Sequence, residues 1–424
     1  MTYAETLAHI YALGRFGIKP GLSRIAPLLA ALGNPQDSFA AVHVVGTNGK
    51  GSTASFLCSM LGAGGYRTGL FTSPHLISFT ERIRVDGAEI GEEDVVRLTG
   101  RVMAAAPPES TFFEIVTALA ALYFAEQGVR IALFEAGMGG RLDATNALHG
   151  ILTAITPVSL DHTDYLGETI EEIAAEKAGI GKPGAPIVSA RQHPDAQRAI
   201  ARRAEEIAAP LYLQGESFDA FWRDHTLCYR GVGVTLDGLE NGLFGRYQSG
   251  NAAVALAAAE LLGTAGFPLT PQAMAAGIAR ADWPGRMEMF PGPPRVLLDG
   301  AHNPAGARAL AEALAEIPRQ RLFLVVGVMG DKELSGILTP LLPLADRVFA
   351  VTPALERALP GEELAFFCLS AGVEAQDAGT VVEGIDQARS AASEDDLILV
   401  CGSLFTVGEA RGHLLSRSFQ PFRG

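Results

Sequence analysis

VHVVGTNGKGST, residues Val42 to Thr53, is the stretch of sequence that decides the fold. The apolar run at its start predicts a buried strand, and the residues after it predict a helix from about Ser52 to Leu61. Glycines between the two let successive backbone N–H groups converge on phosphate oxygens, and Lys50 can reach a β- or γ-phosphate. The spacing is not a strict Walker A motif, which would need glycine at Val44. A glycine-rich turn without a ligand is the alternative, but it gives Lys50 no structural purpose.

Strand-like and helix-like segments alternate along most of the chain, which indicates parallel sheets covered by helices. Further elements are expected as strands at 68–71, 131–135, 151–156 and 186–189, a hairpin at 81–90 and a small antiparallel excursion within 211–248. The stretch 282–294 is rich in proline and glycine and marks a boundary. After it, strands are expected at 295–299, 322–326, 347–351 and 397–401. The sequence therefore predicts an α/β protein with an ATP-binding domain at 1–285 and a smaller Rossmann-like domain at 286–424.

The composition describes an ordinary globular protein of 424 residues with a formal net charge of −14, which disfavours binding to nucleic acid and to anionic membranes. No apolar run approaches the roughly 18 residues that would span a bilayer, and the N-terminus lacks the pattern of a signal peptide. The four cysteines are scattered without metal-ligand spacing and are expected to be reduced. We therefore expect a cytoplasmic protein.

Several short blocks rich in glycine, polar and charged residues follow one another along the chain: GTNGKGS, TSPHL, EAGMGGRLDATN, DHTDYLG, EKAGI, DGAHNP and CGSLFT. In these blocks the sequence resembles the dihydrofolate synthase/folylpolyglutamate synthase family of Mur-ligase-like enzymes. The resemblance implies an N-terminal P-loop ATPase domain like the Mur-ligase central domain, a C-terminal Rossmann-like domain and an active site between them. It also implies an ATP-dependent ligase that joins L-glutamate to dihydropteroate, to folate glutamyl chains or to both through an acyl phosphate, releasing ADP and phosphate.

The family's nucleotide and metal sites can be carried onto this chain residue by residue. The resemblance implies ATP contacts at Thr47, Asn48, Gly49, Lys50, Gly51, Ser52, Asn251, Arg286 and Asp299, and Mg²⁺ ligands at Ser73, Glu135 and His162, with two Mg²⁺ ions and K⁺ as a further candidate. Ser73 and Glu135 also follow from chemistry, because each ends a predicted strand and offers an oxygen to a hard cation. Imidazole prefers softer metals, so chemistry alone leaves His162 open between a metal ligand and a hydrogen-bonding residue.

Two further residues are candidates for catalysis. Lys177 lies in the helical pattern EEIAAEKAGI, where chemistry alone predicts a solvated lysine. The resemblance implies that it is carbamylated, which requires a neutral amine and hence a depressed pKa. His302 follows a predicted strand in DGAHNP, and it stays open between a base, a phosphate ligand and a simple loop residue.

The resemblance also implies where the pteroate or folate binds. Its predicted contacts are Leu22, Ser23, Arg24, Ile25, Thr111, Phe112, Phe113, Glu114, Leu142, Asp143 and Ala144. Phe112 and Phe113 could stack on a flat pterin, although ordinary core packing is the alternative for both. Candidate contacts for the incoming glutamate are Gly330, Asp331, Lys332 and Ser403.

Three rival functions need to be weighed, and two of them would carry different sequence features. A folylpolyglutamate synthase without dihydrofolate synthase activity shares every motif above. A Mur-type peptide ligase usually has a nucleotide-sugar domain before the phosphate loop, and only 45 residues precede Gly46. A P-loop nucleotide-binding switch of the GTPase kind would carry NKxD, and no asparagine is followed by lysine. We therefore expect small-molecule substrates only, and a monomer.

Overall fold

The first half of the molecule is organised around one large, mostly parallel sheet. The computed structural model describes residues 1–17 and 19–420, and in them this sheet has eight strands in the order β4-β3-β2-β5-β1-β6-β7-β8. The strands are β1 (Ala40–Val45), β2 (Thr68–Phe71), β3 (Ile83–Val85), β4 (Ala88–Glu89), β5 (Ile131–Glu135), β6 (Gly150–Ile155), β7 (Ile187–Ser189) and β8 (Leu211–Leu213). Only β3 and β4 run antiparallel to their neighbours, and they form the expected hairpin at one edge.

Alternating side chains of the central strands enter two different cores, as expected for a sheet with helices on both faces. Val42 and Val44 of β1 pack under α3 (Lys50–Ala63), α9 (Gln248–Leu262) and α10 (Pro271–Arg280). Residues such as Phe71 and Phe134 pack on the opposite face against α1 (Tyr3–Tyr11), α2 (Ile25–Ala31), α4 (Glu92–Ala105) and α5 (Phe112–Glu126). A third cluster buries α7 (Ile170–Ala178) and α8 (Pro194–Glu206), which follow the short α6 (Thr163–Leu166).

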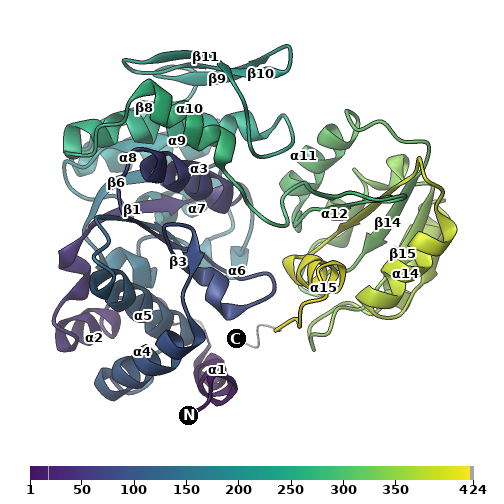
Figure 1. Ribbon diagram of the computed structural model, residues 1–424, viewed down its shortest axis with the longest axis horizontal. Helices are drawn as coiled ribbons and strands as arrows, with labels where there is room; N and C mark the ends of the chain where they lie inside the picture. Colours follow the sequence, from purple (N-terminus) through teal and green to yellow (C-terminus); the bar gives the residue numbers. More distant parts are fainter. Residues whose placement is uncertain (18, 421–424) are drawn as a thin grey trace.

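A separate antiparallel sheet covers one edge of this domain. In the described part of the chain it has three strands, β9 (Asp219–Arg223), β10 (Thr226–Arg230) and β11 (Thr235–Leu239), in the order β11-β10-β9. Figure 1 shows it lying over α9 and α10. The predicted excursion is thus shorter than 211–248, because β8 pairs in parallel with β7 and belongs to the large sheet.

The second half forms its own sheet. Among the described residues this sheet has six strands in the order β12-β13-β17-β14-β15-β16, with only β12 antiparallel. They are β12 (Glu288–Phe290), β13 (Arg295–Leu298), β14 (Leu322–Val326), β15 (Arg347–Ala350), β16 (Ala375–Asp377) and β17 (Leu397–Cys401). One face is covered by α11 (Pro304–Leu314), α12 (Leu334–Leu338) and α13 (Gly361–Ser370), the other by α14 (Val381–Ala391) and α15 (Leu404–Leu414). Figure 1 shows this unit beside the first.

The predicted α/β fold class is confirmed, and the differences are local. The stretch 282–294, expected to lack regular structure, contains β12, which extends the second sheet at its edge. The short edge strand β16 was not expected. Six 3₁₀ helices complete the described residues, at Ala12–Phe16, Pro35–Ser38, Phe79–Arg82, Ala144–Ala147, Gly263–Ala265 and Leu342–Leu344. In the same described part of the chain, no helix is both long and apolar enough to cross a membrane.

Candidate active site

The glycine-rich segment Gly46 to Ser52, which we call the phosphate loop, joins the end of β1 to the start of α3, as the sequence predicts. Gly46 and Gly49 have φ angles of 150° and 86°, a region that L side chains rarely adopt. A Cβ atom at Gly46 would collide with Thr156, and one at Gly49 with the side chain of Asn251. Because both positions are glycine, α9 brings Asn251 directly against the loop. The loop leads directly into the N-terminus of α3, which begins at Lys50, and the N-terminus of a helix favours an anion.

Two lysines converge on this loop. The Nζ of Lys50 donates to the carbonyl oxygens of Thr47 (3.1 Å) and Gly46 (3.4 Å), and the Nζ of Lys177 donates to the same Gly46 oxygen (2.9 Å). Lys177 is 5% exposed, so it is not the solvated lysine that its helical pattern suggests. Burial, followed by the charge of Lys50, lowers the pKa of Lys177 to about 7. A substantial fraction of this amine is therefore neutral near pH 7.

Glu135 and Ser73 lie together at the carboxyl ends of two adjacent strands, β5 and β2. The Oε2 of Glu135 accepts a hydrogen bond from the backbone N–H of Ser73 (3.2 Å), and its Oε1 lies 3.9 Å from the Nζ of Lys50. Burial raises the pKa of Glu135, while Lys50 opposes that shift. A buried carboxylate with so few partners favours a cation beside it. This carboxylate and the Ser73 hydroxyl are oxygen donors of the kind that Mg²⁺ prefers.

His162, the third predicted metal ligand, lies just before α6. It has a left-handed backbone (φ 52°), and its side chain is 47% exposed. Its neighbour Asp161 pairs with Lys332 of the second domain, with 2.9 Å between Oδ1 and Nζ. Burial raises the pKa of Asp161, but the charges of His162 and Lys332 outweigh this effect. The pKa is lowered to about 2, so the carboxylate stays charged. Across the described residues, no group of three or more His, Cys, Asp or Glu side chains is close enough to hold a metal ion.

The block DGAHNP brings the second domain onto the phosphate loop. The side-chain amides of Asn303 and Asn48 donate to each other's oxygens at 2.9 and 3.1 Å. Asp299 is buried and accepts from the backbone N–H groups of Met287 (3.0 Å) and Ala301 (2.9 Å). Burial raises the pKa of Asp299, and the charge of Arg286 opposes the shift.

Arg286 and His302 lie against the backbone of this block. The guanidinium of Arg286 occupies the space that a Cβ atom at Gly300 would fill. The Nδ1 of His302 donates to the Gly300 carbonyl oxygen (2.8 Å). Burial lowers the pKa of His302 to about 4, so the ring is neutral near pH 7 and its Nε2 carries a lone pair.

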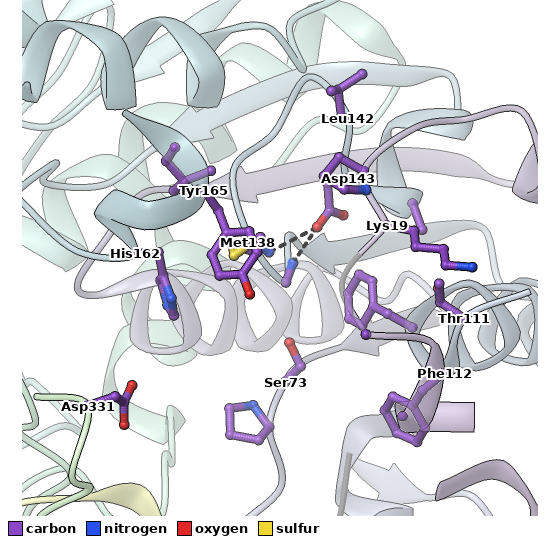
Figure 2. Close-up of a pocket in the computed structure, with 18 of the residues that line it drawn as sticks. Lys19, Ser73, Thr111, Phe112, Met138, Leu142, Asp143, His162, Tyr165 and Asp331 are labelled. Atoms are coloured by element: carbon purple, nitrogen blue, oxygen red, sulfur yellow. Dashed lines mark hydrogen bonds between the residues drawn. The ribbon is translucent and has the colours of Figure 1, made fainter. Parts of the chain in front are cut away.

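A cavity of about 540 Å³ opens between the two domains. The first domain contributes residues from several segments, and Figure 2 shows Ser73, Met138, His162 and Tyr165 facing a common space. The second domain contributes residues that include His302, Asp331, Lys332, Ser403 and Phe405. Ser73 also lines a smaller pocket with Gly51, Glu135 and Arg286. Ser73 thus lies where the cavity meets the phosphate loop.

Most of the predicted acceptor contacts line this cavity, but one segment does not. Thr111 to Glu114 and Leu142 to Ala144 are on its wall. Within the described residues, Lys19, Pro20 and Gly21 line it in place of the predicted Leu22, Ser23, Arg24 and Ile25. The chain turns inward there, because Ile25 begins α2 and is fully buried in the core. Arg24 instead donates to Glu114 (3.1 Å) and to the Lys19 carbonyl (2.6 Å).

Some residues on the wall have structural partners that the motif does not reveal. Asp143 accepts from the backbone N–H groups of Gly137 (2.9 Å), Met138 (3.0 Å) and Thr145 (2.9 Å), the first two of which are drawn in Figure 2. Its carboxylate therefore holds the glycine-rich loop in shape. Phe112 belongs to the hydrophobic core and Phe113 packs against it, so both are core residues that also border the cavity.

Of the residues predicted to contact glutamate, Asp331, Lys332 and Ser403 line the cavity, whereas Gly330 is not among its lining residues. The Oγ of Ser403 accepts from the Thr406 backbone N–H (3.0 Å) and caps α15.

Sequence reasoning missed several lining residues. Arg82 is fully buried and borders the cavity. In the sequence it is part of the predicted hairpin, and nothing in that pattern indicates a binding role. Tyr165 stands inside the block DHTDYLG, so the motif was available as a signal. Trp283 of the proline-rich linker packs on Gly51 of the phosphate loop.

Comparison with known proteins places these features in one family. The Mur ligase middle domain matches residues 44–259, and the Mur ligase glutamate ligase domain matches residues 285–404. The chain is 36% identical to the dihydrofolate synthase/folylpolyglutamate synthase of Bacillus subtilis (strain 168), over 97% of this chain and 99% of that protein. It is similar to Escherichia coli FolC in complex with DHPP and ADP (TM-score 0.91, 32% identity, 98% of each chain covered). It is also similar to the bifunctional folylpolyglutamate synthase/dihydrofolate synthase of Yersinia pestis complexed with AMPPNP and a Mn ion (TM-score 0.89, 32% identity, 98% of each chain covered).

Proposed function

The chain belongs to the dihydrofolate synthase/folylpolyglutamate synthase family of Mur-type ligases, and we propose that it joins L-glutamate to dihydropteroate and to folate glutamyl chains at the expense of ATP. The observation that carries this proposal is the position of Ser73. It lines both the interdomain cavity and the pocket beside Gly51 and Glu135. An acceptor in the cavity can therefore present its carboxylate to a phosphate held by the loop.

The reaction follows from this arrangement in two displacements. An oxygen of the acceptor carboxylate attacks the γ-phosphorus of ATP, the bond to the ADP oxygen breaks, and an acyl phosphate forms. The neutral α-amine of glutamate then attacks the acyl carbon, the bond to the phosphate oxygen breaks, and the amine loses a proton. The net change converts a carboxylate, an ammonium and ATP into an amide, ADP, phosphate and a proton.

Lys50 and the loop N–H groups act on the phosphates. Their positive charge lies beside the transferring group, where it neutralises charge that develops in the transition state. Thr47, Asn48, Gly49, Gly51 and Ser52 would contact ATP with them, and Asn251, Arg286 and Asp299 would contact the nucleotide from α9 and the second domain. The Asn48–Asn303 pair supports this assignment, because it brings the second domain onto the loop.

The ADP and AMPPNP complexes of the relatives support nucleotide binding, and the Mn ion in one of them supports a divalent metal. We propose Mg²⁺ at Ser73, Glu135 and His162, in two sites, with K⁺ as a further ion. The under-partnered Glu135 carboxylate fits such an ion. When bound, the metal would supply Lewis-acid neutralisation of phosphate charge.

We propose a carbamate on Lys177 and a role in proton transfer for His302. The depressed pKa of Lys177 supplies the neutral amine that reaction with CO₂ requires. The neutral His302 ring keeps Nε2 as an acceptor on the cavity wall. Acceptor contacts are proposed at Thr111 to Glu114 and Leu142 to Ala144, and glutamate contacts at Asp331, Lys332 and Ser403. The domain boundary is proposed at 285/286, just before β12 joins the second sheet.

Product analysis tests the proposal directly. Purified protein with ATP, Mg²⁺ and L-glutamate should convert dihydropteroate to dihydrofolate and extend reduced folates by glutamate, with one ADP per bond formed. If only reduced folates were converted, the protein would be a folylpolyglutamate synthase without dihydrofolate synthase activity. Glutamate-dependent ADP release with neither acceptor would overturn the assignment of the cavity.

A further inference from the structure

The loop that follows Ser73 belongs to the first domain but is buried in the second. Leu76 and Ile77 are part of a hydrophobic cluster formed mainly by second-domain residues, among them Val407 and Ala410 of α15. Gly408 of the same helix lies so close to the Leu76 carbonyl that a Cβ atom there would collide with it. The two domains are therefore joined at this loop as well as at the linker.

The segment after α15 crosses to the same loop. We call residues Arg417–Gln420 the C-terminal strap. It leaves α15 toward the first domain (Figure 1), and the backbone N–H of Gln420 donates to the Ile77 carbonyl (2.9 Å). The side-chain Oε1 of Gln420 accepts three hydrogen bonds from the first domain, donated by the Ser78 hydroxyl (3.3 Å), the Phe79 N–H (3.3 Å) and the Tyr3 hydroxyl (3.5 Å).

A chain of hydrogen bonds leads from the strap to the cavity. The carbonyl oxygen of Gln420 accepts from the Nε2 of His75 (3.1 Å), and the Nδ1 of His75 accepts from the Nε of Arg82 (2.9 Å). Since a carbonyl oxygen only accepts and the Arg82 Nε–H only donates, one neutral tautomer of His75 satisfies both bonds. The Arg82 guanidinium lies 5.3 Å from the centre of the Phe112 ring and borders the cavity.

We propose that Gln420 is a positioning residue for the acceptor site. The strap fixes the ring of His75, and His75 fixes the guanidinium of Arg82 at the wall that faces the acceptor. This inference rests on the proposed function, because it assigns the cavity to an anionic acceptor. A guanidinium held in one orientation binds such an acceptor without first losing side-chain freedom. The strap therefore acts on acceptor affinity and leaves the phosphate loop unchanged.

Three variants of the strap test this. Gln420→Ala removes the Oε1 acceptor, so we expect the KM for the acceptor to rise about five- to tenfold, with kcat and the KM for ATP within about twofold of the wild type. Gln420→Glu places a carboxylate oxygen where the amide oxygen lies and should keep the wild-type KM, because the Ser78 hydroxyl, the Phe79 N–H and the Tyr3 hydroxyl all donate to Oε1. Ser418→Ala, at an exposed position of the same segment, is the matched control.

Hydrogen exchange provides a second readout that does not depend on turnover. In Gln420→Ala, the Phe79 amide loses its acceptor, so a peptide covering residues 75–82 should exchange faster than in the wild type or in Ser418→Ala. Faster exchange with an unchanged acceptor KM would make the strap merely structural and would overturn the positioning role. A wild-type enzyme without acceptor turnover would instead refute the proposed function, so the two failures are distinguishable.

If Gln420→Ala does not fold, His75→Asn tests the same positioning role. The Oδ1 of asparagine can occupy the place of Nδ1 and accept from Arg82, but no atom reaches the Gln420 carbonyl. We expect this variant to reproduce the rise in acceptor KM. A His75→Asn enzyme with wild-type acceptor KM would show that Arg82 needs no support from the strap.

Discussion

The phosphate loop and the acceptor cavity are built on opposite principles. The loop is one contiguous segment whose backbone N–H groups are proposed to bind phosphate, and its glycines pack against Thr156 and Asn251. The cavity wall is made of side chains from at least six separate segments in two domains. A change in the loop removes a contact with the reacting phosphate, whereas a change in the wall alters how an acceptor is held. The loop should therefore govern kcat, and the wall should govern the KM for the acceptor.

The largest effect is expected at the loop. Lys50→Ala should lower kcat for glutamate-dependent ADP release on the order of a hundredfold or more, because it removes a preorganised charge at the transferring phosphate. Among the described residues its side chain donates to two loop carbonyls and lies 3.9 Å from Glu135, so thermal unfolding should show an intact fold. A variant with near wild-type turnover would remove Lys50 from the mechanism and would break the contrast between loop and wall.

This contrast also explains what could be predicted from the sequence. Gly46 to Ser52 could be located without a structure because the segment is local: strand, glycines, lysine and helix follow each other in the chain. The cavity is non-local, and the predicted contacts at Leu22 to Ile25 missed its wall by a few residues. A short motif does not show where the chain turns inward, and here α2 begins at Ile25 and buries it.

Two other limits of sequence reasoning have the same origin. Asp143 was assigned to the acceptor from its block, but its hydrogen bonds to Gly137, Met138 and Thr145 are visible only once the loop is folded. Arg82 was not assigned at all, because a hairpin pattern does not show that its guanidinium is buried beside a cavity. The edge strand β12 was hidden by prolines that flank it.

A comparably large effect, with a pH signature, is expected at Lys177, which belongs to neither region but touches the loop. Lys177→Ala should be inactive and partly restored by a small carboxylate, whereas Lys177→Arg should stay inactive. Because the pKa of Lys177 is about 7, the amine is mostly protonated at pH 6 and mostly neutral at pH 8. Labelling with ¹³C-bicarbonate should therefore give a carbamate signal in wild type that grows from pH 6 to pH 8.

Stability offers an independent check of the same group. The folded-state pKa lies below the ordinary value of 10.5, so the unfolded chain binds more protons between about pH 7 and pH 10.5, and the wild type gains stability as the pH rises through this window. Lys177→Met removes the buried cation, and its gain in unfolding temperature should be larger at pH 6 than at pH 9. The same gain at both values, or an active Lys177→Arg enzyme, would contradict a neutral amine at this position.

The smallest effect is expected where the structure and the motif disagree, at residues 22–25. Ser23 is exposed and lies off the cavity wall, so Ser23→Ala should change the KM for the acceptor by less than about twofold. Met138→Ala is the matched comparison, since Met138 lines the cavity and Figure 2 shows its side chain facing the common space. Loss of this apolar contact should raise the acceptor KM about three- to tenfold with kcat nearly unchanged, because a few buried methylene-sized groups contribute that much to binding. Steady-state kinetics with acceptor varied at saturating ATP and glutamate would measure both variants. If Ser23→Ala raised KM as much as Met138→Ala, the acceptor would reach beyond Gly21, and the wall would have to be extended to the predicted segment.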